Sequence, residues 1–308
     1  MASYRATDGR AVRYVHQRLN TSVFGDIDLL MDNVLRVTGH LGEPAVRVRP
    51  AAGGRPYALD AGGSPWRTFG FIDGSVAHTR FSSPAQAAEG AAVAARLVAD
   101  LAGLAPPLPE VIPGFHDVVR RLHTLEAARS ADPCGQAAEC RAEVDAVLGH
   151  AGVAERVAAA RADGRLPERT VHNDAKVENL LFDATTGAAL CLVDLDTVGP
   201  GTVLFDVGDL VRSGALSGPE DGGPDTTAVD AGIVAAILDG YARAGAGFLT
   251  AGEVGLLALA GPLMALEASA RFLTDHLQGD VYFRVDGPGH NLRRARNQIR
   301  VLELLLAG

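Results

Sequence analysis

Cysteine is scarce in this sequence, and its scarcity excludes two kinds of site. The three cysteines are odd in number and form no C-x-x-C pair. A disulfide framework or a structural zinc site needs more cysteines at regular spacing. The pattern fits a reducing compartment, and we expect the protein in the cytoplasm. The cysteines are Cys134, Cys140 and Cys191.

Basic charge and long apolar runs are also in short supply. With a net charge of −9, the chain lacks the basic face that a nucleic-acid-binding surface needs. The opening residues, MASYRATDGR, have no apolar core of the secretory type. No apolar run approaches the roughly 18 residues of a membrane span. We therefore expect a soluble protein without a nucleic-acid or membrane partner, and the sequence specifies no oligomeric state.

Several catalytic patterns are missing as well. The sequence contains no H-E-x-x-H zinc motif, no G-x-S-x-G elbow and no G-x-x-x-x-G-K-[ST] phosphate loop. What remains is a chain of 308 residues that is 47% hydrophobic, long enough for two lobes that share a cleft. Because aromatic residues make up only 5%, we expect a core of small and aliphatic side chains.

The first quarter of the chain is predicted to be rich in β-strand. Apolar residues at helical spacing predict one helix over 26–41, with Asp26 as its N-cap. Strands are expected at 13–19, 45–48, 56–59 and 65–72, with turns at Asp8-Gly9, Gly53-Gly54 and Gly62-Gly63.

The rest of the chain is predicted to be mainly helical. Pro84 stands where a first helical turn accepts proline, and an Ala-rich helix follows over 87–101. Further helices are expected at 116–129, 136–149, 152–163, 226–245 and 251–277, with a last one starting near 291.

One stretch carries chemistry: VHNDAKVEN at 171–179, followed by CLVDLD at 191–196. Two apolar runs around a turn separate them and predict a hairpin that brings Asn179 and Asp194 to the same end. Phosphoryl transfer from a nucleotide needs a carboxylate such as Asp174 to orient and deprotonate the acceptor, and oxygens that hold magnesium. The alternative is a hairpin whose Asp and Asn serve only turns. We favour the catalytic interpretation because turns need no fixed Asp–Asn offset.

The stretch from His172 to Arg212 resembles the aminoglycoside phosphotransferase and choline kinase superfamily, and most of all the N-acetylhexosamine 1-kinases. The similarity covers nearly the whole chain, including 17–24, 66–72 and 271–298. It implies an α+β fold with two lobes, like that of protein kinases. A small β-rich nucleotide-binding lobe would span 1–74, and a larger, mainly helical catalytic and substrate-binding lobe would span 75–308.

The resemblance also implies a reaction and its cofactors. ATP and Mg²⁺ would supply a phosphoryl group to the anomeric hydroxyl of an N-acetylhexosamine or a related sugar. Asp174 would be the base, and Asn179 and Asp194 would hold the metal. Asp196 is a weaker metal candidate, with a role as a turn or supporting acid as its alternative. Lys176 could reach the transferring phosphate or be a surface lysine.

Other positions of this resemblance are predicted to support the loop or bind the nucleotide. His172 would hydrogen-bond backbone near the metal-binding Asp, and Asp206 would hold the catalytic loop or simply cap a helix. Gln17 or Arg18 would take the place of the phosphate-binding lysine of kinases, with Asp32 as the helical acid. Arg18 could equally be a solvated edge residue. Asp73 and Gly74 would form the hinge that faces adenine.

The acceptor side is expected to use Arg271 and Tyr282, which keep the spacing of the family's sugar-binding Arg and Tyr. A helix-end charge and a core aromatic are the alternatives. The family's Gly-rich segment before the first strand is visible here only as its tail, Ser3-Tyr4, with Ala2 at the acidic position. Either the start codon is assigned too late, or a phosphate lid and one sugar-binding carboxylate are lost. Two rival hypotheses follow: a phosphotransferase for an antibiotic or another secondary metabolite, and a catalytically silent sugar- or nucleotide-binding relative.

Overall fold

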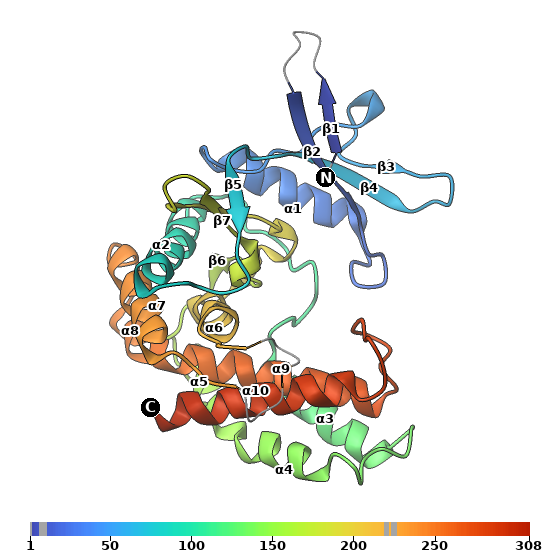
Figure 1. The fold of residues 1–308 in the computed structure, drawn as a ribbon, viewed down its shortest axis with the longest axis vertical. Helices are drawn as coiled ribbons and strands as arrows, with labels where there is room; N and C mark the ends of the chain where they lie inside the picture. Colours follow the sequence, from blue (N-terminus) through green and yellow to red (C-terminus); the bar gives the residue numbers. More distant parts are fainter. Residues whose placement is uncertain (1, 6–10, 219–221, 223–226) are drawn as a thin grey trace.

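A computed structural model describes residues 2–5, 11–218, 222 and 227–308. Its described residues form a small lobe with a β-sheet and a larger helical lobe, which confirms the predicted fold class (Figure 1). The turn expected at Asp8-Gly9 lies outside the described residues.

The small lobe is an antiparallel sheet with one helix packed beside it. Its strand order is β1-β2-β4-β3. Helix α1 forms where the apolar spacing predicts it, and the Asp26 side chain accepts the Leu29 N–H as its N-cap. The buried face of α1 presents Leu30, Met31, Val34 and Val37 to the core. The elements are β1 (Ala2–Arg5), β2 (Ala11–Arg18), α1 (Ile27–His40), the 3-10 turn η1 (Ala52–Gly54), β3 (Ala58–Leu59) and β4 (Pro65–Gly70).

The large lobe consists mainly of helices, with α9 and α10 lying side by side (Figure 1). Its helices are α2 (Pro84–Leu101), α3 (Val118–Ala131), α4 (Arg141–Gly149), α5 (Ala151–Ala162), α6 (Val203–Gly214), α7 (Ala231–Ala244), α8 (Ala251–Leu256), α9 (Ala260–Leu277) and α10 (His290–Ala307). Two small sheets hold the central loops: β5 (Ser75–Ala77), β7 (Leu180–Asp183) and β8 (Ala189–Leu192) form one, and β6 (Arg169–Val171) pairs with β9 (Gly199–Gly201).

Two predicted elements differ in the structure. The expected strand at 45–48 is reduced to a single bridge between Val48 and Phe69. Because β4 ends at Gly70, the antiparallel register leaves residues 45–46 without a strand to pair with. The single helix expected over 251–277 is broken by a 3-10 turn, η5 (Leu257–Leu259). Pro262 explains the break, since proline has no N–H to continue a helix and is tolerated in the first turn of a new one, α9.

Helices α6 and α9 approach each other closely in the centre of the large lobe. A Cβ atom on Gly208 of α6 would lie 2.3 Å from the carbonyl oxygen of Ala260, and one on Gly261 of α9 would lie 2.7 Å from a methyl carbon of Val211. Such distances exclude any side chain at either glycine. The stretch Ala251–Leu277 is apolar enough for a membrane span, but 78% of its most apolar part is buried inside the fold, as in the core helix of a globular protein.

Candidate active site

The hairpin of β7 and β8 places two of the predicted residues together. Leu180 pairs with Leu192, and the Val193 N–H donates to the Asn179 carbonyl over 2.8 Å. Asn179 closes the 3-10 turn η2 (Val177–Asn179) and Asp194 precedes η3 (Leu195–Thr197), so both lie at one end of the hairpin. This confirms the predicted hairpin and its consequence for these two side chains.

The catalytic loop is fixed by a buried carboxylate of α6. Asp206 accepts the backbone N–H groups of His172 at 2.9 Å and of Asn173 at 2.8 Å. His172 Nε2 lies 3.0 Å from the carbonyl of Val193, beside Asp194. Both contacts are those predicted for His172 and Asp206, and Asp206 stands inside α6 instead of capping it. Burial raises the pKa of Asp206 to about 6, although the two N–H donors act in the opposite direction.

Asp174 receives two donors on one oxygen. Its Oδ2 atom accepts from Lys176 Nζ at 2.5 Å and from Asn179 Nδ2 at 3.0 Å. Asn179 Nδ2 also donates to the Asp174 carbonyl at 2.8 Å, so the amide nitrogen is committed and Oδ1 of Asn179 is left as an acceptor. Burial alone lowers the pKa of Lys176, but the Asp174 charge and hydrogen bond outweigh it, and the net pKa is raised. Lys176 is therefore an ammonium ion.

A buried arginine from the small lobe faces the other carboxylates. Arg67 of β4 has a side chain only 1% exposed, and its Nη1 lies 2.5 Å from Asp196 Oδ1. Its Nη2 lies 3.9 Å from Asp194 Oδ1, and its Nε donates to Gln17 Oε1 at 3.1 Å. Sequence reasoning missed Arg67. The sequence does contain a sign of it. Side chains alternate along a strand, and Arg67 stands at the position between Pro65 and Phe69 on the face that is buried.

The oxygen donors at the end of the hairpin fit a hard divalent cation. In the described part of the chain, no group of three His, Cys, Asp or Glu side chains could hold a metal by itself, so a cation at this place would also have to use the amide oxygen of Asn179. The Asp194 side chain is 41% exposed. Burial, followed by repulsion from Asp196 and Asp174, raises the pKa of Asp194. A bound cation would relieve this crowding of carboxylates, and carboxylate and amide oxygens are the ligands that such ions prefer.

The structure brings Gln17 to this group but not Arg18. Side chains alternate across a strand, so Gln17 faces Arg67 while Arg18 points away and is exposed. Asp32 is also exposed, on the outer face of α1. The cation beside the hairpin carboxylates therefore comes from β4, and the nucleotide-binding role of Gln17 and Arg18 stays a prediction.

Asp73 and Gly74 lie where the chain leaves β4 and enters β5. Gly74 adopts a left-handed conformation with φ 74°, and its carbonyl accepts the Ala184 N–H at 2.7 Å. Asp73 forms an exposed ion pair with Arg13 at 2.5 Å. The role of this segment as a hinge, its contact with adenine and the lobe boundary after residue 74 stay predictions.

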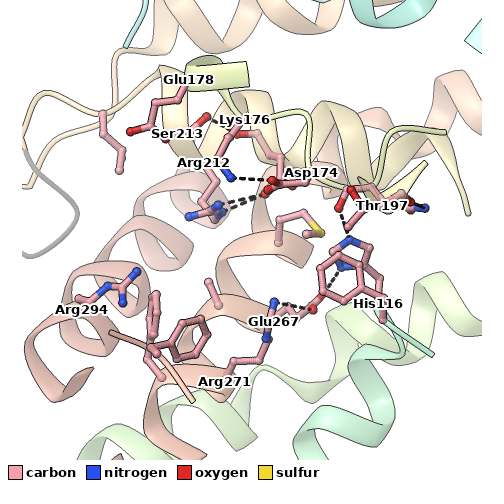
Figure 2. Close-up of a pocket in the computed structure, with 18 of the residues that line it drawn as sticks. His116, Asp174, Lys176, Glu178, Thr197, Arg212, Ser213, Glu267, Arg271 and Arg294 are labelled. Atoms are coloured by element: carbon pink, nitrogen blue, oxygen red, sulfur yellow. Dashed lines mark hydrogen bonds and ion pairs between the residues drawn. The ribbon is translucent and has the colours of Figure 1, made fainter. Parts of the chain in front are cut away.

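A cavity of about 850 Å³ joins the catalytic loop to the acceptor side. Figure 2 shows Asp174 and Lys176 on one side of it and Arg271 of α9 on the other. Arg271 Nη2 lies 3.3 Å from the Tyr282 hydroxyl, and its guanidinium lies over the rings of Phe115 and Tyr282 at 5.3 and 5.6 Å. The predicted acceptor residues therefore lie in the same cavity as the predicted base.

The family described as the phosphotransferase enzyme family, APH, matches residues 3–247. The chain belongs to this phosphotransferase family. Its match begins within β1 and extends past α7, so the loop of Asp174, the hairpin and Asp206 all fall within it.

Solved structures show the same fold for this phosphotransferase. An aminoglycoside phosphotransferase from Alicyclobacillus acidocaldarius is 12% identical, with a TM-score of 0.59, and the match covers 99% of this chain and 88% of that one. A choline/ethanolamine kinase family protein from Mesorhizobium loti is 18% identical, with a TM-score of 0.57 and coverage of 100% and 93%. Choline kinase LicA from Streptococcus pneumoniae is 13% identical, with a TM-score of 0.53 and coverage of 98% and 93%.

Two more buried groups of the phosphotransferase line the cavity and were missed in the sequence. His116 precedes α3 and Glu267 belongs to α9. A histidine in a loop carries no local pattern that predicts its partner. A glutamate at a core-facing position of an apolar helix does indicate a buried partner, because glutamate is rarely buried unpaired, but it does not say which residue that partner is.

Proposed function

We propose that this phosphotransferase transfers the γ-phosphoryl group of ATP to a hydroxyl of a small acceptor, the anomeric hydroxyl of an N-acetylhexosamine or a related sugar. The observation that carries the proposal is the position of Asp174. Its carboxylate meets Lys176 and Asn179 and opens on a cavity whose other side holds Arg271. Among the structural relatives, LicA has been solved in complex with AMP, which supports a nucleotide as the donor.

Asp174 has one oxygen available for the acceptor. Oδ2 is occupied by Lys176 and Asn179, whereas Oδ1 accepts no hydrogen bond from any described residue. An acceptor hydroxyl at Oδ1 would give its proton to Asp174 as its oxygen bonds to the γ-phosphorus and the bond to ADP breaks. Positioning supplies most of the catalysis in such a reaction, and the base adds to it.

Two groups near the base can handle the charge of the phosphates. Lys176 is an ammonium ion 2.5 Å from Asp174, close enough to interact with the group being transferred. Asn179 Oδ1 and Asp194 would hold Mg²⁺, which offsets the negative charge of the phosphates when bound. Asp196 is engaged by Arg67 and supports the site from behind.

The acceptor side favours a neutral polyol. Arg271 presents fixed donors for sugar hydroxyls, and Tyr282 offers a ring face and a hydroxyl. The guanidinium of Arg271 opposes a cationic acceptor at the same place, whereas several structural relatives are named for choline, ethanolamine or aminoglycosides.

The test is an ADP-release assay with ATP and Mg²⁺ against N-acetylhexosamines, other hexoses, choline, ethanolamine and aminoglycosides. We expect turnover with a free sugar, and ³¹P NMR should identify a sugar 1-phosphate. Asp174→Asn should lower kcat by about 10²- to 10⁴-fold with little change in the KM for ATP. Glu155→Gln, at an exposed site on α5, is the matched control. A variant lacking the Asp174 carboxylate that turns over at the parent rate would end the proposal.

A further inference from the structure

His116 links the acceptor side of the cavity to the catalytic loop. Its side chain is buried between the rings of Phe115 and Phe205, with centroid distances of 4.3 and 4.6 Å. Its Nδ1 lies 2.8 Å from Glu267 Oε2, and its Nε2 lies 2.8 Å from the carbonyl oxygen of Asn173. Figure 2 shows His116 and Glu267 joined in this way at the cavity wall.

Both partners of the ring can only accept hydrogen bonds. A carboxylate and a backbone carbonyl have no proton to give, so each nitrogen of His116 must carry one, and the ring is an imidazolium. Burial opposes this charge, but the Glu267 carboxylate outweighs it, and the pKa of His116 is raised. Asp209 of α6 acts in the same direction. Burial opposes the charge of Glu267, but His116, followed by Arg271 and Arg121, outweighs it, and the pKa of Glu267 is lowered.

The carbonyl that His116 holds belongs to a residue in an unusual conformation. Asn173 has φ 62°, in the left-handed region that only asparagine, aspartate and glycine visit with ease. Its N–H is held by Asp206 and its side-chain amide donates to Thr197 O at 3.0 Å. His116 holds the remaining backbone group. Because the peptide unit is planar, fixing this carbonyl also fixes the N–H and the Cα of Asp174, from which its side chain extends.

We propose that His116 is a positioning residue for phosphoryl transfer, which aims the Asp174 carboxylate by holding the peptide that precedes it. Glu267 holds His116, and its Oε1 atom lies 3.8 Å from Nη1 of Arg271. Glu267 therefore lies beside the residue proposed to bind the acceptor. This role deepens the proposed function and rests on it. In this role His116 acts through the loop and not directly on the acceptor or the nucleotide.

Two isosteric substitutions separate the two contacts of the ring. The amide nitrogen of His116→Gln reaches the place of Nε2 and keeps a donor for Asn173, while it leaves Glu267 without its partner. The amide nitrogen of His116→Asn reaches the place of Nδ1, keeps a donor for Glu267 and releases Asn173. We expect His116→Asn to lower kcat by about 10- to 100-fold, with the KM for ATP within about twofold of the parent. His116→Gln should keep kcat within about threefold of the parent.

The order of the two variants in stability should be the reverse of their order in kcat. His116→Gln leaves a buried carboxylate unpaired and should melt below His116→Asn, yet remain the faster enzyme. If kcat instead follows the melting temperature, or if His116→Asn keeps the parent kcat, the positioning role is wrong. Hydrogen exchange in the 170–180 segment gives a readout that needs no turnover: exchange should be faster in His116→Asn and like the parent in His116→Gln. A parent without turnover would refute the proposed function, while the exchange pattern still decides the role of His116.

Discussion

Replacing Arg67 with methionine should destabilise the protein by about 3–5 kcal/mol, the usual cost of leaving one partner of a buried ion pair alone. The Arg67 side chain is 1% exposed and that of Asp196 is 11% exposed, so solvent cannot take over the role of the lost cation. Methionine retains most of the apolar stem and therefore adds little cavity cost. For a chain of 308 residues, this corresponds to a fall in Tm of about 5–8 °C.

Urea unfolding followed by circular dichroism, together with a thermal scan, measures the effect. Arg18→Met is the control, since Arg18 lies in the same sheet but is exposed, and it should stay within about 0.5 kcal/mol of the parent. Adding Asp196→Asn to Arg67→Met should restore part of the loss, because a neutral amide is cheaper to bury than a lone carboxylate. The reasoning fails if Arg67→Met unfolds with the parent, or if the second substitution deepens the loss.

Three further outcomes follow from buried groups. Burial raises the pKa of Asp206 from 3.8 to about 6, so the folded chain binds more protons between these values and stability falls as pH rises through them. In urea unfolding, the parent should gain roughly 2.5 kcal/mol over Asp206→Asn between about pH 8 and pH 4. Burial raises the pKa of the Cys191 thiol to about 11, so only about one molecule in a thousand is a thiolate at pH 8, and a native thiol titration should label exposed Cys134 far faster. Glu253→Ala should lower the free energy of unfolding by about 3–5 kcal/mol, since the buried Glu253 carboxylate lies 2.6 Å from Arg169; a loss under 1 kcal/mol in chemical denaturation would contradict this.

Local chemistry predicted much of the fold and the centre of the site. The cap at Asp26 and the apolar stripe of α1 are properties of a short segment, and the structure has them where they were expected. The offset between Asp174 and Asn179 is equally local, because one tight turn brings both side chains together. In the same way, the turn between two apolar runs was enough to predict the hairpin that carries Asp194.

Partners that come from distant elements could not be predicted in the same way. His116 meets Asn173 and Glu267 across separations of 57 and 151 residues, and no periodicity records such a meeting. Arg67 was overlooked because a cation was sought only on β2, where Arg18 is exposed; the buried arginine lies on the neighbouring strand β4 and meets Asp196 across the lobes. The break before α9 had a local sign, Pro262, that an apolar pattern read over the whole segment concealed.

The contact of α6 with α9 couples the two sides of the cavity. At Gly208 and Gly261 nothing but hydrogen separates the helices from their neighbours, so neither position can take a larger residue unless the helices move apart. One helix carries the carboxylate that holds the loop of Asp174, and the other carries Arg271. A side chain added at either glycine would therefore change the distance between the proposed base and the proposed acceptor residue, although neither glycine lines the cavity.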